Sequence, residues 1–377
     1  MLVIALSLVV AVMGVATVWL RRLAERRRTD MFSLAFGILA AAWFSMMALS
    51  AKLAAELHGV SPQVNQVARG CVGWALVAID LRCDRAVLCP ELGGRRRPML
   101  SLCGRVAFGI AAMLLYFIGL SSDQLGVGDA TALYMTYPLW TVALTVCKGE
   151  ASCSLALCAS SFLCFVGMLG ITQPGWLFHR ARARQPDENS SPVHEGGDAL
   201  LPALAMLGSG ICMALGVEFL GRLRSECALD ARQIVHVFFA TTAVVGSVSI
   251  ALSGEWRSMG SSLPGAWMLL LLCGACGYGA QFSMAAAVLT GETNAAFALT
   301  QNVELVLTYA YQVAIFSQPL GTGQVMGALL VALGVFVLKA APSRWSGHWL
   351  HLRMCPPFLA RRRHEKIPVQ VLPAGHA

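Results

Sequence analysis

The chain has 377 residues, of which 57% are hydrophobic and 13% are charged, and its formal net charge is +8. Soluble globular domains carry about a quarter charged residues, so this composition excludes a chain that covers itself with a water-facing surface. The basic residues are split into clusters between apolar stretches, a pattern that marks membrane orientation and argues against one nucleic-acid-binding face.

Several apolar stretches are long enough to cross a hydrocarbon core, for which a helix needs about 20 residues. In lipid, backbone polar groups must pair within the segment, so these stretches predict helices and an all-α integral membrane protein. The predicted spans are 2–20, 31–54, 63–81, 101–121, 126–147, 153–172, 199–219, 232–252, 265–288, 293–316 and 321–340.

Residues 1–30 are predicted to form a signal-anchor-like helix followed by a basic segment. No basic residue precedes the apolar stretch, no small-residue cleavage site follows it, and the sequence RRLAERRR comes directly after it. We expect this helix to stay attached, with its N-terminus outside and the basic cluster in the cytoplasm.

The same orientation places most other basic loops in the cytoplasm, together with the basic tail 341–377. The exception is the polar loop 173–198, which is rich in Pro and Gly and contains three arginines. This loop also carries Asn189 in an N-glycosylation sequon, which makes sense only on the outer or lumenal side. We therefore expect a multi-pass protein of the plasma membrane or an endomembrane, with a cytoplasmic C-terminus.

The loop 173–198 divides the main body into residues 31–172 and residues 199–340, each with five predicted spans. An odd number of spans forces the second half to enter the membrane upside down relative to the first. Secondary transporters are often built from inverted repeats of this kind, with the substrate between the halves near the midplane. The expected fold is a ten-helix bundle of two inverted five-helix repeats plus one extra N-terminal helix.

Three segments carry a family likeness: GILAAAWFSMMALSAKLAAELHGVSPQVNQVARG (37–70), GVGDATALYMTYPLWTVALTVCKGE (126–150) and QNVELVLTYAYQVAIFSQPLGTGQVMGALLVALGVFVL (301–338). They resemble the opening helix pair, the fourth span and the closing helix pair of the EamA-type family in the drug/metabolite transporter superfamily. Gln318 stands where this family usually has a glutamate, and Asn302 where a tyrosine is common. The resemblance implies a ten-helix carrier of small organic solutes and names no particular substrate.

Glu304 lies near the middle of its predicted span, where a carboxylate costs about 2.5–3.5 kcal/mol on insertion scales. It should face the bundle interior, be paired or be protonated, which makes it the sharpest candidate for substrate translocation. The alternative is a structural carboxyl bonded to a neighbouring helix. Gln301, Asn302, Thr308, Tyr309 and Gln312 lie on the same helix, and residues 301, 304, 308 and 312 form one polar stripe. Such a stripe either lines a water-filled path or holds membrane helices together.

Pro138 occupies roughly the matching depth in the first half, with Tyr134 and Tyr137 beside it. A proline inside a helix removes one backbone hydrogen bond and kinks the segment, and the freed carbonyl can line a cavity. This position is a candidate counterpart of Glu304, and an ordinary membrane-helix kink is the alternative.

Lys52 and Arg69 are expected near the outer ends of adjoining spans, with Asp129 near the same level. They are candidates for contact with an anionic substrate, and the alternative is that the two basic side chains extend to the lipid headgroups. The headgroup position is also expected for Arg105, Glu218 and His236.

These features favour a transmembrane transporter that moves a small organic solute by alternating access, with or without a coupled proton or counter-solute. The chain has no phosphate-binding loop, H-E-x-x-H or G-x-S-x-G motif, so we expect no enzyme, catalytic residue or cofactor. Cys273 and Cys276 have C-x-x-C spacing but no second pair, so no metal site is expected. The expected partners are the lipid bilayer and the substrate, without nucleic acid, and a homodimer is compatible. A non-transporting or channel-like subunit is the alternative function, ahead of a membrane enzyme.

Overall fold

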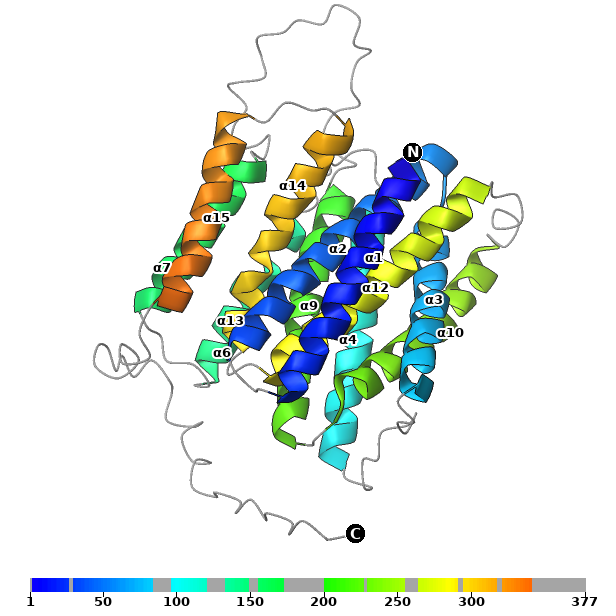
Figure 1. The fold of residues 1–377 in the computed structure, drawn as a ribbon, viewed down its shortest axis with the longest axis horizontal. Helices are drawn as coiled ribbons and strands as arrows, with labels where there is room; N and C mark the ends of the chain where they lie inside the picture. Colours follow the sequence, from blue (N-terminus) through cyan, green and yellow to red (C-terminus); the bar gives the residue numbers. More distant parts are fainter. Residues whose placement is uncertain are drawn as a thin grey trace, which may run out of the picture.

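The computed structural model describes residues 2–26, 30–83, 96–120, 133–148, 155–172, 200–226, 229–254, 264–290, 294–316 and 321–340. All regular elements in these residues are α-helices, which confirms the all-α prediction (Figure 1). They are α1 (Leu2–Arg26), α2 (Asp30–His58), α3 (Pro62–Cys83), α4 (Arg96–Leu120), α6 (Tyr137–Cys147), α7 (Leu155–Thr172), α9 (Leu200–Glu226), α10 (Ala231–Ser253), α12 (Pro264–Thr290), α13 (Asn294–Thr300), α14 (Asn302–Phe316) and α15 (Thr322–Ala340).

Among the described residues, five helices are long and apolar enough to cross a membrane by length and composition: α2, α4, α9, α10 and α12. Helix ends differ from the predicted ends by a few residues in most spans. The larger differences are in α1, which continues to Arg26, in α4, which begins at Arg96, and in α9, which continues to Glu226. The loop 173–198, the tail 341–377 and the candidates Asp129 and Asn189 lie outside the described residues.

The helices pack in pairs that join distant parts of the sequence. Helix α4 packs against α9, and α2 packs against α12. Helices α7 and α15 lie side by side at one end of the bundle, and α3 and α10 at the opposite end (Figure 1). The interior between these outer pairs is lined by both the early and the late helices of the chain.

Small residues bring α3 and α10 into direct backbone contact. A Cβ added at Gly70 would lie 2.7 Å from the backbone nitrogen of Ala243, and one added at Gly246 would lie 2.8 Å from the side chain of Val67. Close approach through small residues is a common way for apolar helices to associate where lipid removes the hydrophobic driving force.

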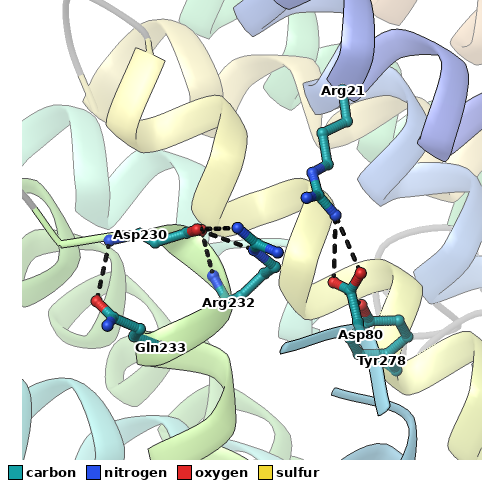
Figure 2. A network of polar contacts seen from close by, with 6 residues as sticks. All are labelled: Arg21, Asp80, Asp230, Arg232, Gln233 and Tyr278. Atoms are coloured by element: carbon teal, nitrogen blue, oxygen red, sulfur yellow. Dashed lines mark hydrogen bonds and ion pairs between the residues drawn. The ribbon is translucent and has the colours of Figure 1, made fainter. Parts of the chain in front are cut away.

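Helix α1 packs on the outside of the bundle against α12 and α2. Figure 2 shows how Arg21 holds it there: the Nη1 donates to Asp80 Oδ1 and Oδ2 at 3.0 and 3.4 Å. The Tyr278 hydroxyl donates to the same carboxylate at 3.0 Å. A cavity of about 290 Å³ is lined by residues of α1, α2, α3 and α12, among them Thr17, Trp43 and the residues of this network.

The start of α10 has a local signal in the sequence. Asp230 is the N-cap residue, and its carboxylate accepts from the backbone nitrogen of Arg232 at 3.0 Å (Figure 2). The Gln233 side chain accepts in return from the Asp230 backbone nitrogen at 3.4 Å. This reciprocal capping box satisfies backbone donors that would otherwise lack partners, so the helix begins here.

Candidate substrate site

The helix that contains Pro138 is interrupted just before that residue. The chain turns at Met135 and Thr136, and α6 begins at Tyr137. The Thr136 hydroxyl donates to the carbonyl of Leu133 at 2.8 Å. Pro138 has no N–H to offer to the carbonyl of Tyr134, four residues earlier, so the regular hydrogen-bond ladder is not continued through this turn.

A second interruption separates α13 from α14 at Gln301. No proline is present there, and the predicted continuous span 293–316 is wrong at this point. The Thr300 hydroxyl donates to the carbonyl of Phe297 at 2.6 Å, and Asn302 Nδ2 donates to the carbonyl of Leu299 at 3.1 Å. Such side chains compete with backbone donors for carbonyl groups and bend the helix. Helix α13 contacts α6, so the two interrupted segments meet.

The polar residues around the second interruption are buried. Gln301 is fully buried, and Asn302, Glu304 and Thr308 are each at most 7% exposed. Gln301 Nε2 donates to the carbonyl of Gly37 on α2 at 2.8 Å. Among the described residues, Gln301 Oε1, Glu304 Oε2 and Thr308 Oγ1 have no hydrogen-bond partner. The interior thus contains polar atoms that the described chain does not satisfy.

Three tyrosines form a continuous aromatic row beside Glu304. The ring centroids of Tyr116 and Tyr134 are 4.8 Å apart, and those of Tyr134 and Tyr137 are 5.4 Å apart. All three rings are at most 2% exposed. Each of the three hydroxyl groups is within electrostatic range of Glu304. The structure therefore brings Tyr134 and Tyr137 into the electrostatic range of Glu304, and Pro138 lies in the first turn of α6 directly after Tyr137.

Two buried arginines lie near this aromatic row. Arg69 on α3 is fully buried and Arg105 on α4 is 2% exposed. Both guanidinium carbons lie over the ring of Phe238, at 5.6 and 5.2 Å from its centroid, and Arg69 also lies 5.5 Å from that of Phe239. Arg105 Nη2 donates to Gln281 Oε1 on α12 at 2.5 Å. Tyr134 is within electrostatic range of both arginines and so connects them to the aromatic row.

Glycines provide the space for these two side chains. A Cβ at Gly277 would lie 2.9 Å from Arg69 Nε, and one at Gly109 would lie 2.6 Å from Arg105 Nη1. Both arginine side chains are buried inside the protein, which contradicts the expected surface position of Arg105 and the surface alternative for Arg69. The burial of Arg105 was not predicted, because the span was expected to begin at residue 101, which places Arg105 near the helix end. Since α4 begins at Arg96, Arg105 lies well inside the helix.

The remaining candidate, Lys52, pairs with Glu56 on its own helix at 3.3 Å. Glu218, expected at the interface, is instead buried at 2% exposure. It forms ion pairs with Lys148 and, at 3.4 Å, with Arg222, and it accepts from Asn294 Nδ2 at 3.5 Å. This second charged cluster joins the ends of α6 and α9 to the start of α13. Within the described residues, no group of three or more His, Cys, Asp or Glu side chains could hold a metal ion.

The geometry defines an all-α protein with several helices able to cross a membrane and a buried polar cluster contributed by early and late helices. No family model matches the chain, and no curated protein matches it. Its fold is similar to that of a solved structure described only as "Crystal structure of protein", with a TM-score of 0.63 and 13% sequence identity. The similarity covers 83% of this chain and 99% of that chain. At this identity the likeness concerns the fold alone.

Proposed function

We propose that this chain is a multi-pass membrane transporter that moves a small organic solute by alternating access. The observation that carries the proposal is the meeting of two interrupted helices, α6 and α13–α14, beside buried polar atoms that have no hydrogen-bond partner among the described residues. Transporters use broken helices in this way, because interrupted backbone exposes polar groups only where a substrate or water can reach them. A scaffold would gain nothing from such groups.

The packing of the helices supports two inverted repeats. We assign α2, α3, α4, α6 and α7 to the repeat 31–172, and α9, α10, α12, α13–α14 and α15 to the repeat 199–340. The third helix of each repeat then packs on the first helix of the other, as α4 on α9 and α12 on α2. The second helices pair as α3 with α10, and the fifth as α7 with α15. A twofold axis that exchanges the repeats accounts for this pattern.

The resemblance to the EamA-type family points in the same direction. It covers about residues 31–340, and the interrupted helices α6 and α13–α14 are the fourth and ninth helices of that assignment. The lipid bilayer, a small-molecule substrate and a plasma-membrane or endomembrane location complete the proposal. Coupling to a proton through Glu304, or exchange against a counter-solute, are both compatible with it.

Reconstitution tests the proposal. Purified protein in proteoliposomes should show saturable counterflow of a solute, in which an internal pool accelerates uptake of the labelled compound. Ohmic conductance across a planar bilayer would instead favour the channel-like alternative. Chemical conversion of the solute, followed by mass spectrometry, would favour a membrane enzyme.

A further inference from the structure

Arg69 and Arg105 carry two buried positive charges, and no described residue neutralises them. Arg69 Nε, Nη1 and Nη2 and Arg105 Nη1 are buried without a hydrogen-bond partner among the described residues. An arginine cannot shed its charge in a protein. Because an uncompensated buried charge is costly, two such groups facing one aromatic ring are unfavourable unless they have a ligand to bind.

The two guanidinium groups lie near the same aromatic ring. Their central carbons are 5.6 Å (Arg69) and 5.2 Å (Arg105) from the centroid of Phe238. They also repel each other electrostatically. A dianion between or beside them would remove this repulsion and supply the missing acceptors together.

Glu304 forms no hydrogen bond with Arg69, because all three guanidinium nitrogens of Arg69 are without a partner among the described residues. Arg105 Nη1 and Glu304 Oε2 also lack a hydrogen-bond partner there. The aromatic rings attract the arginines but carry no net charge. Gln281 satisfies one N–H group of Arg105 and no charge.

We propose that Arg69 and Arg105 bind a small organic dianion, bearing a phosphate or two carboxylate groups, and that this dianion is the transported substrate. The inference rests on the proposed transporter function and names its substrate class. The planar guanidinium group of arginine can donate two parallel hydrogen bonds to two oxygens of a carboxylate or phosphate. The buried N–H groups of Arg69 and Arg105 that lack a partner therefore suit such a ligand. Tyr134, in range of both arginines, would accept or donate at the remaining polar groups of the ligand.

The test combines thermal unfolding in detergent with counterflow in proteoliposomes. The anionic probes are inorganic phosphate, glucose 6-phosphate and malate, and the neutral and cationic probes are glucose and choline. We expect at least one anionic probe to raise the melting temperature and to show counterflow. Arg69→Gln and Arg105→Gln should each weaken both effects by about 30-fold or more, because truncating one partner of a buried charge pair costs that much affinity.

The melting temperatures of the Arg69→Gln and Arg105→Gln variants without a probe distinguish a binding role from a structural role. Removing an unpaired buried charge should leave the melting temperature without probe unchanged or raise it. Arg97→Gln is the matched control, because Arg97 is exposed on the same helix as Arg105; it should leave both assays unchanged. Arg105→Lys keeps the charge but loses the fork, so it should bind the anionic probes more weakly than the parent.

Three results would overturn the inference. The first is stabilisation and counterflow by glucose or choline but by no anionic probe, which would leave the carrier proposal standing. The second is an anion effect that survives in both arginine variants. The third is a lowered melting temperature of the unliganded variants, which would show that the arginines are structural. Conductance without any counterflow would instead contradict the transporter function itself.

Discussion

Buried carboxyl groups in this protein have two different surroundings. Glu218 is held by Lys148, Arg222 and Asn294. Glu304 has one carboxyl oxygen without any partner in the described part of the chain. The carboxyl of Glu218 is therefore held by partners, whereas that of Glu304 is not fully satisfied. Substitution by glutamine should lower the stability at Glu218 but not at Glu304.

Glu304→Gln should leave the melting temperature unchanged or raise it, because no ion pair is lost. Counterflow should be lost, since an amide cannot exchange a proton as a carboxyl can. Thermal unfolding and counterflow of the purified variant measure both effects. Glu56→Gln, at a more exposed carboxyl, is the control. Counterflow equal to that of the parent would remove Glu304 from the site.

Glu218→Gln should lower the free energy of unfolding by about 1–3 kcal/mol, because Lys148 loses its buried charged partner. The cost stays below that of a fully buried pair because the Lys148 side chain is 28% exposed and can reach water. Denaturant or thermal unfolding measures this. Arg222→Gln should cost less, since that side chain is 45% exposed. Equal stability of Glu218→Gln and the parent would contradict the assignment of a structural ion pair.

At the level of elements, the helices differ in how they approach one another. The outer pair α3 and α10 touches through backbone atoms at Gly70 and Gly246. In the interrupted segments α6 and α13–α14, by contrast, side chains hydrogen-bond to carbonyl groups of the same segment. The contact between α3 and α10 has no tolerance for added volume.

Gly70→Ala should destabilise the protein by about 1–3 kcal/mol, because the new Cβ would meet the backbone of Ala243, which cannot move aside by rotamer change. Gly14→Ala is the matched control on α1, where an added Cβ has no atom within 4 Å. That change should be neutral or stabilise by up to about 1 kcal/mol through helix propensity. Thermal unfolding of both variants measures the change in stability. Equal effects of Gly70→Ala and Gly14→Ala would contradict the close contact between α3 and α10.

At the scale of the whole molecule, the orientation in the membrane is a prediction from the charge distribution. Asn189 should be glycosylated when the protein is made in a eukaryotic host, and glycosidase treatment should change its mobility on a gel. Cys355, in the basic tail, should react with an impermeant thiol reagent only from the cytosolic side. Asn189→Gln and Cys355→Ser are the controls. Labelling of Cys355 from outside intact cells would reverse the proposed topology.

The local pattern was sufficient for the fold class and for most helix positions. The described parts of the apolar stretches are largely helical, because the transfer of their own side chains and the pairing of their own backbone are local properties. Glu304 and the proline-associated break at Tyr137 could also be found locally, because a carboxyl or a proline inside an apolar run is unusual at that position. The break at Gln301 could not, because threonine and asparagine side chains choose their acceptors only in the packed structure.

By itself, the amino-acid sequence determined the all-α class, the apolar segments and the presence of a carboxyl within one of them. Only the tertiary structure decided that Arg105 is buried, because its partner Gln281 is 176 residues away and its space is provided by glycine. It also placed Arg69, Tyr134 and Glu304 in one cluster. The physical reason is that burial of a charge depends on which helices pack around it, whereas formation of a helix depends on its own residues.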